Sequence, residues 1–246
     1  MALFSVDVTV PGHAASLSAT QNIAEPWKLS VWQAVKDVWQ QGYLKEPCAV
    51  RFTFNLETSL YKQTAVYNLL KSTTDGLSRA IFDKCPGGSE WNREDWRIVQ
   101  LHARKQVATH APSVRIEIDP PTSQPLHVTE NLLAHTFVPG SPPLWPGDSV
   151  GATKVMKWRE HLVQSLEVAK QPDVSMALGC DFHFAVEPDR MQTSDLDNFC
   201  VPAAQAVGRA LFGDVNQARR LIGLHATKMG VSGDNQLGTR VRVWQE

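Results

Sequence analysis

The chain has 246 residues, of which 43% are hydrophobic and 20% are charged, and its formal net charge is −1. This composition excludes a disordered chain. The near-neutral charge excludes a protein that is basic over its whole surface, so any DNA contact must come from a local patch. The four cysteines form no C-x-x-C pair, which argues against zinc and fits a reducing cytoplasm. The N-terminus lacks the pattern of a signal peptide and no apolar run has the length of a membrane span, so we expect a cytoplasmic protein with no membrane partner.

Strand and helix patterns alternate along the first half of the chain. The expected elements after the turn Val10-Pro11-Gly12 are a helix around Trp32 over 29–41, a strand over 49–56, a helix over 68–82, and strands over 97–103 and 113–118. The first of these strands is predicted by the alternation of Val50, Phe52 and Phe54. The proline-rich segment 120–125 is typical of a linker, and a second proline-rich segment, 141–147, predicts a loop.

The second half of the chain repeats the first. Phe52 and Phe54 recur as Phe182 and Phe184, and the same spacing places Asn68 on Asn198 without a gap. Further matches follow in the same order, at 79–80 with 209–210, 101–103 with 224–226, and Lys105 with Lys228. We therefore expect a mixed α/β (α+β) fold in two diverged tandem copies, residues 1–119 and 128–246, joined by a linker over 120–127.

Paired carboxylates in the second copy predict metal chemistry. Asp195 and Asp197 alternate along the chain, so at the end of a strand both would point to one face, where they could bind Mg²⁺ (or Mn²⁺). Asp214 could supply a third carboxylate. The alternative for this segment is helix capping, because Asp195, Asp197 and Asn198 all suit an N-cap and Pro202 suits a first helical turn.

The order of these short motifs resembles the RusA family of Holliday junction resolvases. The family pattern is D-x-D-N, a lysine three residues after the asparagine, a further aspartate, and an acidic pair before a strand. In the second copy 195–198 match its beginning, and in the first copy Asn68, Lys71, Asp75 and the pair Glu94-Asp95 match the rest. The resemblance implies a homodimeric enzyme that cuts branched DNA with Mg²⁺. One chain with two copies would then be a covalently joined, pseudo-two-fold dimer.

The resemblance assigns roles to residues in both copies. The catalytic set is Asp195, Asp197, Lys71, Glu94 and Asp95, with Asp195, Asp197 and Asp214 as metal ligands. The residues expected to contact phosphates are Lys105, Lys228, Arg209, Arg219 and Arg220. Simpler interpretations compete: Glu94-Asp95 as a solvated turn, Lys71 as a solvated helix residue, Lys105 and Lys228 as protection of a strand edge, and His102 and His225 as buried strand histidines.

Each copy departs from the family pattern. The first copy has Ala65 and Tyr67 at the aspartate positions, and the second has Val201 at the lysine position, Gln205 at the later aspartate and Gln217-Ala218 at the acidic pair. Two hypotheses follow. The chain is either an Mg²⁺-dependent endonuclease acting on branched DNA, or a catalytically degenerate relative that binds nucleic acid or a protein partner. We expect the two half-sets to have decayed independently, with Asp195 and Asp197 too far from Glu94 and Asp95 to share one ion.

Overall fold

The structure is a computed structural model, and it describes residues 4–87, 90–122, 131–143, 149–168, 172–173, 175–232 and 237–246. The chain has a mixed α/β fold and divides into two compact units, Met1–Thr122 (unit 1) and Ser123–Glu246 (unit 2). Most of the expected linker and of the second proline-rich loop, residues 123–127 and 144–147, lie outside the described residues. No helix in the described ranges has the length and hydropathy needed to cross a bilayer.

Unit 1 has a four-stranded mixed sheet among its described residues, in the order β1-β4-β2-β3. Only the β2–β3 pair is parallel. Its elements are β1 (Val6–Pro11), α1 (Gln21–Val38), β2 (Cys48–Leu56), α2 (Thr58–Gln63), the 3-10 helix η1 (Val66–Leu69), α3 (Leu70–Ile81), the 3-10 helix η2 (Asp95–Arg97), β3 (Ile98–Val107) and β4 (Ser113–Asp119).

Unit 2 has the strand order β5-β9-β7-β8, with the short β6 added beside β5, again for the residues described. Only β7–β8 is parallel. Its elements are β5 (Leu132–Pro139), α4 (Ser149–Ser165), β6 (Glu167–Val168), β7 (Leu178–Val186), η3 (Arg190–Gln192), α5 (Leu196–Phe212), η4 (Val215–Arg220), β8 (Leu221–Gly230) and β9 (Gly238–Gln245). Apart from β6, strand order and direction are the same as in unit 1.

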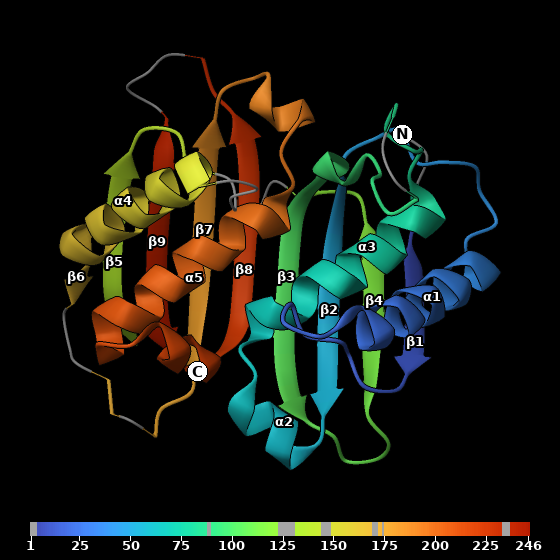
Figure 1. The fold of residues 1–246 in the computed structure, drawn as a ribbon, viewed down its shortest axis with the longest axis horizontal. Coiled ribbons are helices and arrows are strands. Elements are labelled where there is room, and N and C mark those ends of the chain that lie inside the picture. The colour runs from blue at the N-terminus through green and yellow to red at the C-terminus, as the bar shows by residue number, and fades with distance from the viewer. Residues whose placement is uncertain are drawn as a thin grey trace. The chain divides into compact units, whose positions relative to one another are not determined.

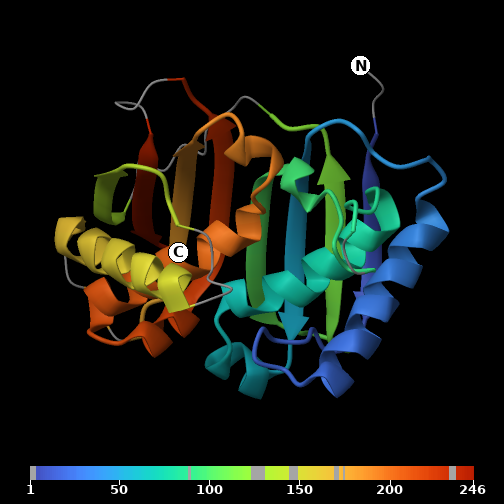
Figure 2. The ribbon, with the colours of Figure 1, turned by 45° about the horizontal axis from the view of Figure 1, so that its top comes forward.

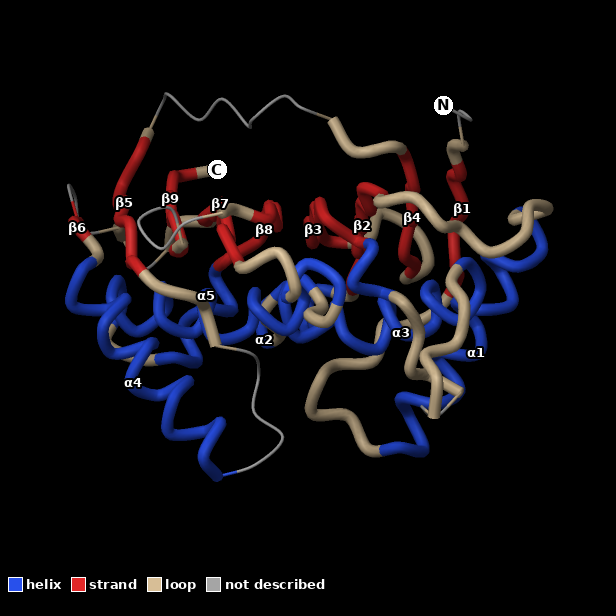
Figure 3. The backbone as a smooth tube through the Cα atoms, turned by 90° about the horizontal axis from the view of Figure 1, so that it is seen from above, coloured by secondary structure: helices blue, strands red, loops and turns tan. Residues whose placement is uncertain are grey.

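Within each unit the helices lie on one face of the sheet. Figures 1 and 2 show α1 and α3 crossing the strands of unit 1, and α4 and α5 crossing those of unit 2. Figure 3, seen along the layers, places the described helices of each unit on the same side of its strands. The opposite side, with no described helix over it, is called here the open face of each sheet.

Strand alternation explains which face is buried. Phe52 and Phe54 of β2 and Phe182 and Phe184 of β7 are fully buried, and the ring of Phe184 lies 5.2 Å from that of Phe199 on α5. Since side chains alternate along a strand, the residues between the phenylalanines lie on the open face. The expected strands over 49–56, 97–103 and 113–118 are confirmed, with β3 extending further, to Val107.

Two helix boundaries differ from the expectation. Helix α1 begins at Gln21 rather than near residue 29 and includes Pro26. Helix α5 begins at Leu196, so Pro202 lies in the helix interior and not in the first turn. A proline removes one backbone donor and so weakens a helix locally. Here the apolar residues on each side, Trp27 and Val201 among them, are buried and keep both helices docked.

The packing of α1 on α3 depends on Gly76. A Cβ atom at this position would lie 2.6 Å from the carbonyl oxygen of Lys28 and 2.8 Å from the Cβ of Val31, so a side chain would force the two helices apart. Gly42, by contrast, has open space around it.

We predict that Gly76→Ala lowers the free energy of unfolding by about 1–3 kcal/mol, because overpacking outweighs the better helix propensity of alanine. Gly42→Ala is the matched control and should change it by less than about 0.5 kcal/mol. Urea unfolding of both variants measures the difference. An unchanged midpoint for Gly76→Ala would show that α1 yields without cost.

Candidate functional site

The paired aspartates of unit 2 lie at the start of α5, not at the end of a strand. Asp195 is the N-cap residue, and its Oδ2 accepts a hydrogen bond from Asn198 Nδ2 at 3.0 Å. Asp197 lies in the first helical turn and is only 5% exposed. Side chains at positions i and i+2 of a helix start do not share a face. The pair therefore lies at a helix start rather than at the end of a strand, with Asp195 in the N-cap position that the capping alternative gives it.

Asp214 cannot complete a metal site with these aspartates. It follows Gly213, the left-handed C-cap of α5, so the 17 residues of the helix, about 25 Å, separate it from Asp195 and Asp197. Its carboxylate instead accepts the backbone N–H of Asn216 at 2.9 Å and caps η4. Nowhere in the described ranges do three His, Cys, Asp or Glu side chains form a group that could hold a metal ion. Asp195, Asp197 and Asp214 therefore do not form one three-carboxylate group.

The positions that depart from the family pattern in unit 2 belong to its core or to interhelical contacts. Val201 and Ala218 are buried at 6% and 1% exposure. Ala218 packs so closely on α5 that a Cβ at Gly208 would lie 2.7 Å from its backbone nitrogen. Gln205 Oε1 accepts a hydrogen bond from Arg159 Nη1 of α4 at 2.6 Å. Apolar packing and a neutral amide thus occupy the positions at which the pattern has ionic groups.

In unit 1 part of the complementary half-set comes together as an ion-pair network. Lys71 Nζ lies 3.1 Å from Asp75 and 3.9 Å from Asp95, and Lys28 Nζ of α1 lies 2.9 Å from Asp75. Both aspartates are 6% exposed. Glu94 is held elsewhere, because Arg97 Nη2 lies 2.8 Å from its carboxylate. Lys71 and Asp95 therefore belong to one ion-pair network, and Glu94 is directed to a different partner.

The matched lysines are buried rather than exposed to a ligand. Lys105 is 1% exposed and donates to the carbonyl oxygens of Tyr61 (2.7 Å) and Thr64 (2.6 Å). Lys228 is 4% exposed and donates to the carbonyls at the equivalent positions, 191 (3.1 Å) and 194 (2.6 Å). This burial contradicts both the phosphate-contact role and the edge-protection role expected of the two lysines. In each unit the ammonium ties the segment before the α3 or α5 region to the neighbouring parallel strand.

The three arginines expected to contact phosphates gather at the far end of α5. Gly208 of α5 packs closely against Ala218 of η4, so Arg209 and the η4 residues Arg219 and Arg220 lie at the same end of α5, and Arg209 and Arg219 are exposed. Arg220 Nε donates to Gln217 Oε1 at 3.1 Å, and its guanidinium lies 4.9 Å from the Phe212 ring. We call Arg209, Arg219 and Arg220 the arginine patch. It sits at a helix C-terminus, where cations are also favoured by the helix dipole.

The open face of unit 2 carries a polar cluster that the sequence did not predict. Asp181, fully buried, accepts from His225 Nδ1 at 2.6 Å and from Arg242 Nε at 3.0 Å, and His183 Nε2 lies 3.0 Å away. Burial alone would raise the pKa of Asp181, but hydrogen bonds from His183, His225 and Arg242 outweigh it and hold that pKa below its usual range. The expectation of a buried strand histidine is confirmed for His225, whereas His102 is only half-buried.

Comparisons with known proteins give this chain no family. No family model matches it, and no curated protein matches. Among solved structures, a cyanuric acid hydrolase from A. caulinodans aligns with 14% identity over 100% of this chain and 72% of the hydrolase, with a TM-score of 0.28. A similarity this low carries no argument on fold or function.

We predict that Lys228→Met or Lys105→Met lowers the free energy of unfolding by about 2–4 kcal/mol, because each leaves two buried carbonyls without their charged donor. Lys62→Met, on exposed helix α2, is the control and should change it by less than about 0.5 kcal/mol. Denaturant titration compares the three. Equal stabilities would mean that the buried ammonium groups contribute nothing net.

We predict that Asp181→Asn destabilises the protein by about 3–5 kcal/mol at pH 7, because Arg242 loses its buried counter-charge. The lowered pKa means that this stabilisation is complete above the unfolded pKa of about 4 and is lost as pH falls through the folded value. The wild type should therefore lose stability below about pH 4, and the variant should lose less over that range. Asp7→Asn, which breaks an exposed ion pair, should cost at most about 1 kcal/mol.

Proposed function

We propose that this chain is a tandem RusA-like protein that binds nucleic acid without cutting it. The two units would be diverged copies of one domain, arranged as a pseudo-two-fold dimer within a single chain. Two observations support the duplication. The strand order and directions are the same in both units. The buried lysines Lys105 and Lys228 donate to carbonyls at matched positions, 61 with 191 and 64 with 194.

The proposed loss of cleavage rests on how the charged groups are distributed between the two units and on the partners that they contact. Hydrolysis of a phosphodiester with Mg²⁺ needs several oxygen ligands around one ion and a cation for the developing phosphate charge. Unit 2 has Asp195 and Asp197 at the start of α5, far from Asp214, with a buried valine at 201 in place of the lysine. In unit 1 the cation Lys71 is shared by Asp75 and Asp95, while the aspartate positions hold buried Ala65 and Tyr67.

The arginine patch supplies the binding surface of the proposal. Arg209 and Arg219 are both exposed, and Arg219 and Arg220 each donate to a neutral glutamine, Gln217. Such cations can contact phosphate oxygens and release counterions, which suits a chain whose overall charge is close to zero. A protein partner with an acidic surface is the alternative occupant of the same patch.

One observation favours the competing function, an Mg²⁺- or Mn²⁺-dependent endonuclease on branched DNA. The segment Asp195-Leu196-Asp197-Asn198 keeps the full D-x-D-N pattern of the resemblance. If cleavage persists, it should depend on Asp195 and Asp197 and be insensitive to Glu94→Gln and Asp95→Asn, because the copies would have decayed independently.

We predict that the protein binds a four-way DNA junction more tightly than linear duplex, that affinity falls steeply with salt, and that neither DNA is cut in Mg²⁺ or Mn²⁺. Fluorescence anisotropy measures binding and denaturing gels measure cleavage. Removing the patch cations in Arg209→Ala/Arg219→Ala should weaken binding and reduce the salt slope by about 0.9 for each lost phosphate contact. Lys36→Ala, an exposed cation on α1, is the control.

Cleavage products that appear with metal and disappear in Asp197→Asn would establish the competing endonuclease. Absence of binding to any DNA would refute the nucleic-acid role and leave the protein partner.

A further inference from the structure

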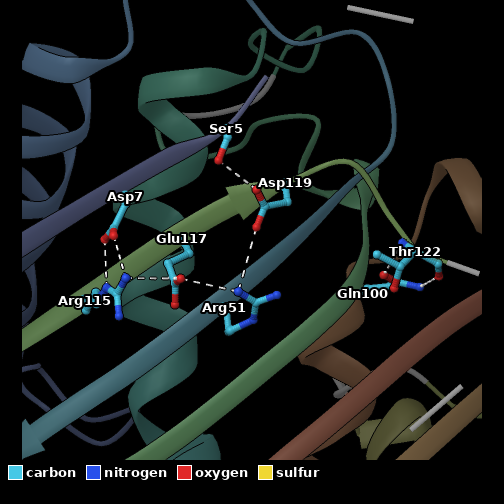
Figure 4. Close-up of polar contacts among 8 residues, drawn as sticks. All are labelled: Ser5, Asp7, Arg51, Gln100, Arg115, Glu117, Asp119 and Thr122. Atoms are coloured by element: carbon cyan, nitrogen blue, oxygen red, sulfur yellow. Dashed lines mark hydrogen bonds and ion pairs between the residues drawn. The ribbon is translucent and has the colours of Figure 1, made fainter. Parts of the chain in front are cut away.

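The open face of unit 1 is a network of exposed ion pairs, drawn in Figure 4. Arg115 Nε donates to Asp7 at 2.9 Å, and its Nη2 lies 3.4 Å from Glu117. Arg51 Nη1 lies 3.4 Å from Glu117 and 3.8 Å from Asp119. Two arginines therefore face three carboxylates, which gives this network a formal charge of −1.

The strand registers identify the equivalent positions in unit 2. Thr9 pairs with Arg115 and Asp7 with Glu117 in unit 1, as Phe137 pairs with Arg240 and His135 with Arg242 in unit 2. Ala49 pairs with Asp119 as Gly179 pairs with Trp244.

All three acidic positions of unit 1 have lost their charge or reversed it in unit 2. At the positions of Asp7, Glu117 and Asp119, the second copy has His135, Arg242 and Trp244. At the positions of Thr9, Arg115 and Arg51, it has Phe137, Arg240 and Asp181. With neutral histidine, two arginines now face the single carboxylate of Asp181, so the set carries +1, and two aromatic rings have been added.

A cleft of about 550 Å³ lies among these residues, and His135, Phe137, Arg240 and Arg242 are in its lining. Phe137 is 46% exposed, and a Cβ at Gly238 would lie 2.4 Å from its ring, so the ring covers that glycine and leaves surface in solvent. Arg240 is exposed and has no ion-pair partner among the described residues, in contrast to its unit 1 equivalent Arg115. The acidic member of the lining, Glu167, lies 3.7 Å from His135 and is 78% exposed.

We propose that this cleft on the open face of unit 2 binds single-stranded nucleic acid. An unpaired base would stack on Phe137, and the phosphates beside it would contact Arg240 and Arg242. Stacking on an exposed aromatic ring beside cations is the usual way in which proteins hold unpaired strands. The buried carboxylate of Asp181 accepts hydrogen bonds from both Nε and Nη2 of Arg242, so this guanidinium is held in place before a ligand arrives.

The proposal extends the nucleic-acid role proposed above to a second surface, and it does not use the arginine patch. A purely structural role, in which the Phe137 ring covers Gly238, would explain the position of that ring and nothing else. It does not explain why the acids around Arg115 are absent around Arg240. A ligand that combines negative charge with planar rings explains both changes.

The test measures binding of a fluorescent 15-nucleotide oligo(dT) by anisotropy across a salt series. Phe137→Leu keeps apolar cover over Gly238 but removes the stacking surface, so affinity should fall about 5- to 150-fold. Arg240→Gln should weaken binding and reduce the salt slope by about 0.7, the value for one single-strand phosphate contact. Arg115→Gln, at the equivalent position in unit 1, should leave the oligo(dT) affinity unchanged. Thermal unfolding confirms that each variant is folded.

The two proposed surfaces can fail separately. The cleft proposal is overturned if the wild type does not bind oligo(dT), even if the junction is still bound. It is also overturned if Phe137→Leu and Arg240→Gln both bind oligo(dT) with the affinity of the wild type. Tight oligo(dT) binding that is lost only in Arg209→Ala/Arg219→Ala also overturns it, because the arginine patch would then hold the strand. The proposal is supported if the affinity for oligo(dT) falls in Phe137→Leu and in Arg240→Gln but not in Arg115→Gln, whatever the junction result.

Discussion

A buried ammonium group is the interaction on which each unit depends. A parallel strand pair needs a crossover connection, and in both units this connection leaves the first strand through a short helix before entering α3 or α5. Lys105 and Lys228, each on the second strand of the pair, donate to two carbonyls of that connection. Burying a charge is costly unless it is hydrogen-bonded, so the lysine and the connection must form together. This coupling fixes the start of α3 in unit 1 and of α5 in unit 2.

The two units also differ in the charges that their paired strands carry, and this difference disfavours pairing between strands of different units. Arg51 of β2 pairs with Glu117 of β4, and at the equivalent positions of β7 and β9 the charges are reversed, as Asp181 and Arg242. If β2 paired with β9, two arginines would be opposite, and β7 on β4 would place two carboxylates opposite. Like charges directly opposite in a sheet are destabilising. The reversal therefore favours each strand's own partner over the corresponding strand of the other unit.

Features that depend on a local pattern were predictable from the sequence, and those that depend on pairing were not. The alternation of Phe52 and Phe54 indicated strand β2 almost to the residue, because burial of one face leaves a period of two. The start of α1 was missed because Pro26 is typical of a helix boundary. Lys105 and Lys228 were recognised as a matched pair. Their burial depends on carbonyls that are distant in the sequence, which no local pattern reveals.

The same reason separates the candidate site into predictable and unpredictable parts. The capping alternative for Asp195 could be drawn from the sequence, and Asp195 is the N-cap residue of α5. The ion pair of Lys71 with Asp95 was not predicted, because it joins residues that are distant in the sequence. The Asp181 cluster could not be anticipated from the sequence, because it depends on the strand register that sets His225 opposite Asp181 across β7 and β8.

Desolvation explains which features the two units share and which they do not. Breaking the contacts of a buried charge costs several kcal/mol, so the helix side of each sheet has kept its lysine and its carbonyl partners. Exposed ion pairs such as Arg115–Asp7 contribute about 0–1 kcal/mol, so their charges can change sign with little effect on stability. The open face is therefore where unit 2 can carry Phe137 and Arg242 at the positions of Thr9 and Glu117 while the scaffold stays intact. A new binding surface arises most easily there, because stability constrains it least.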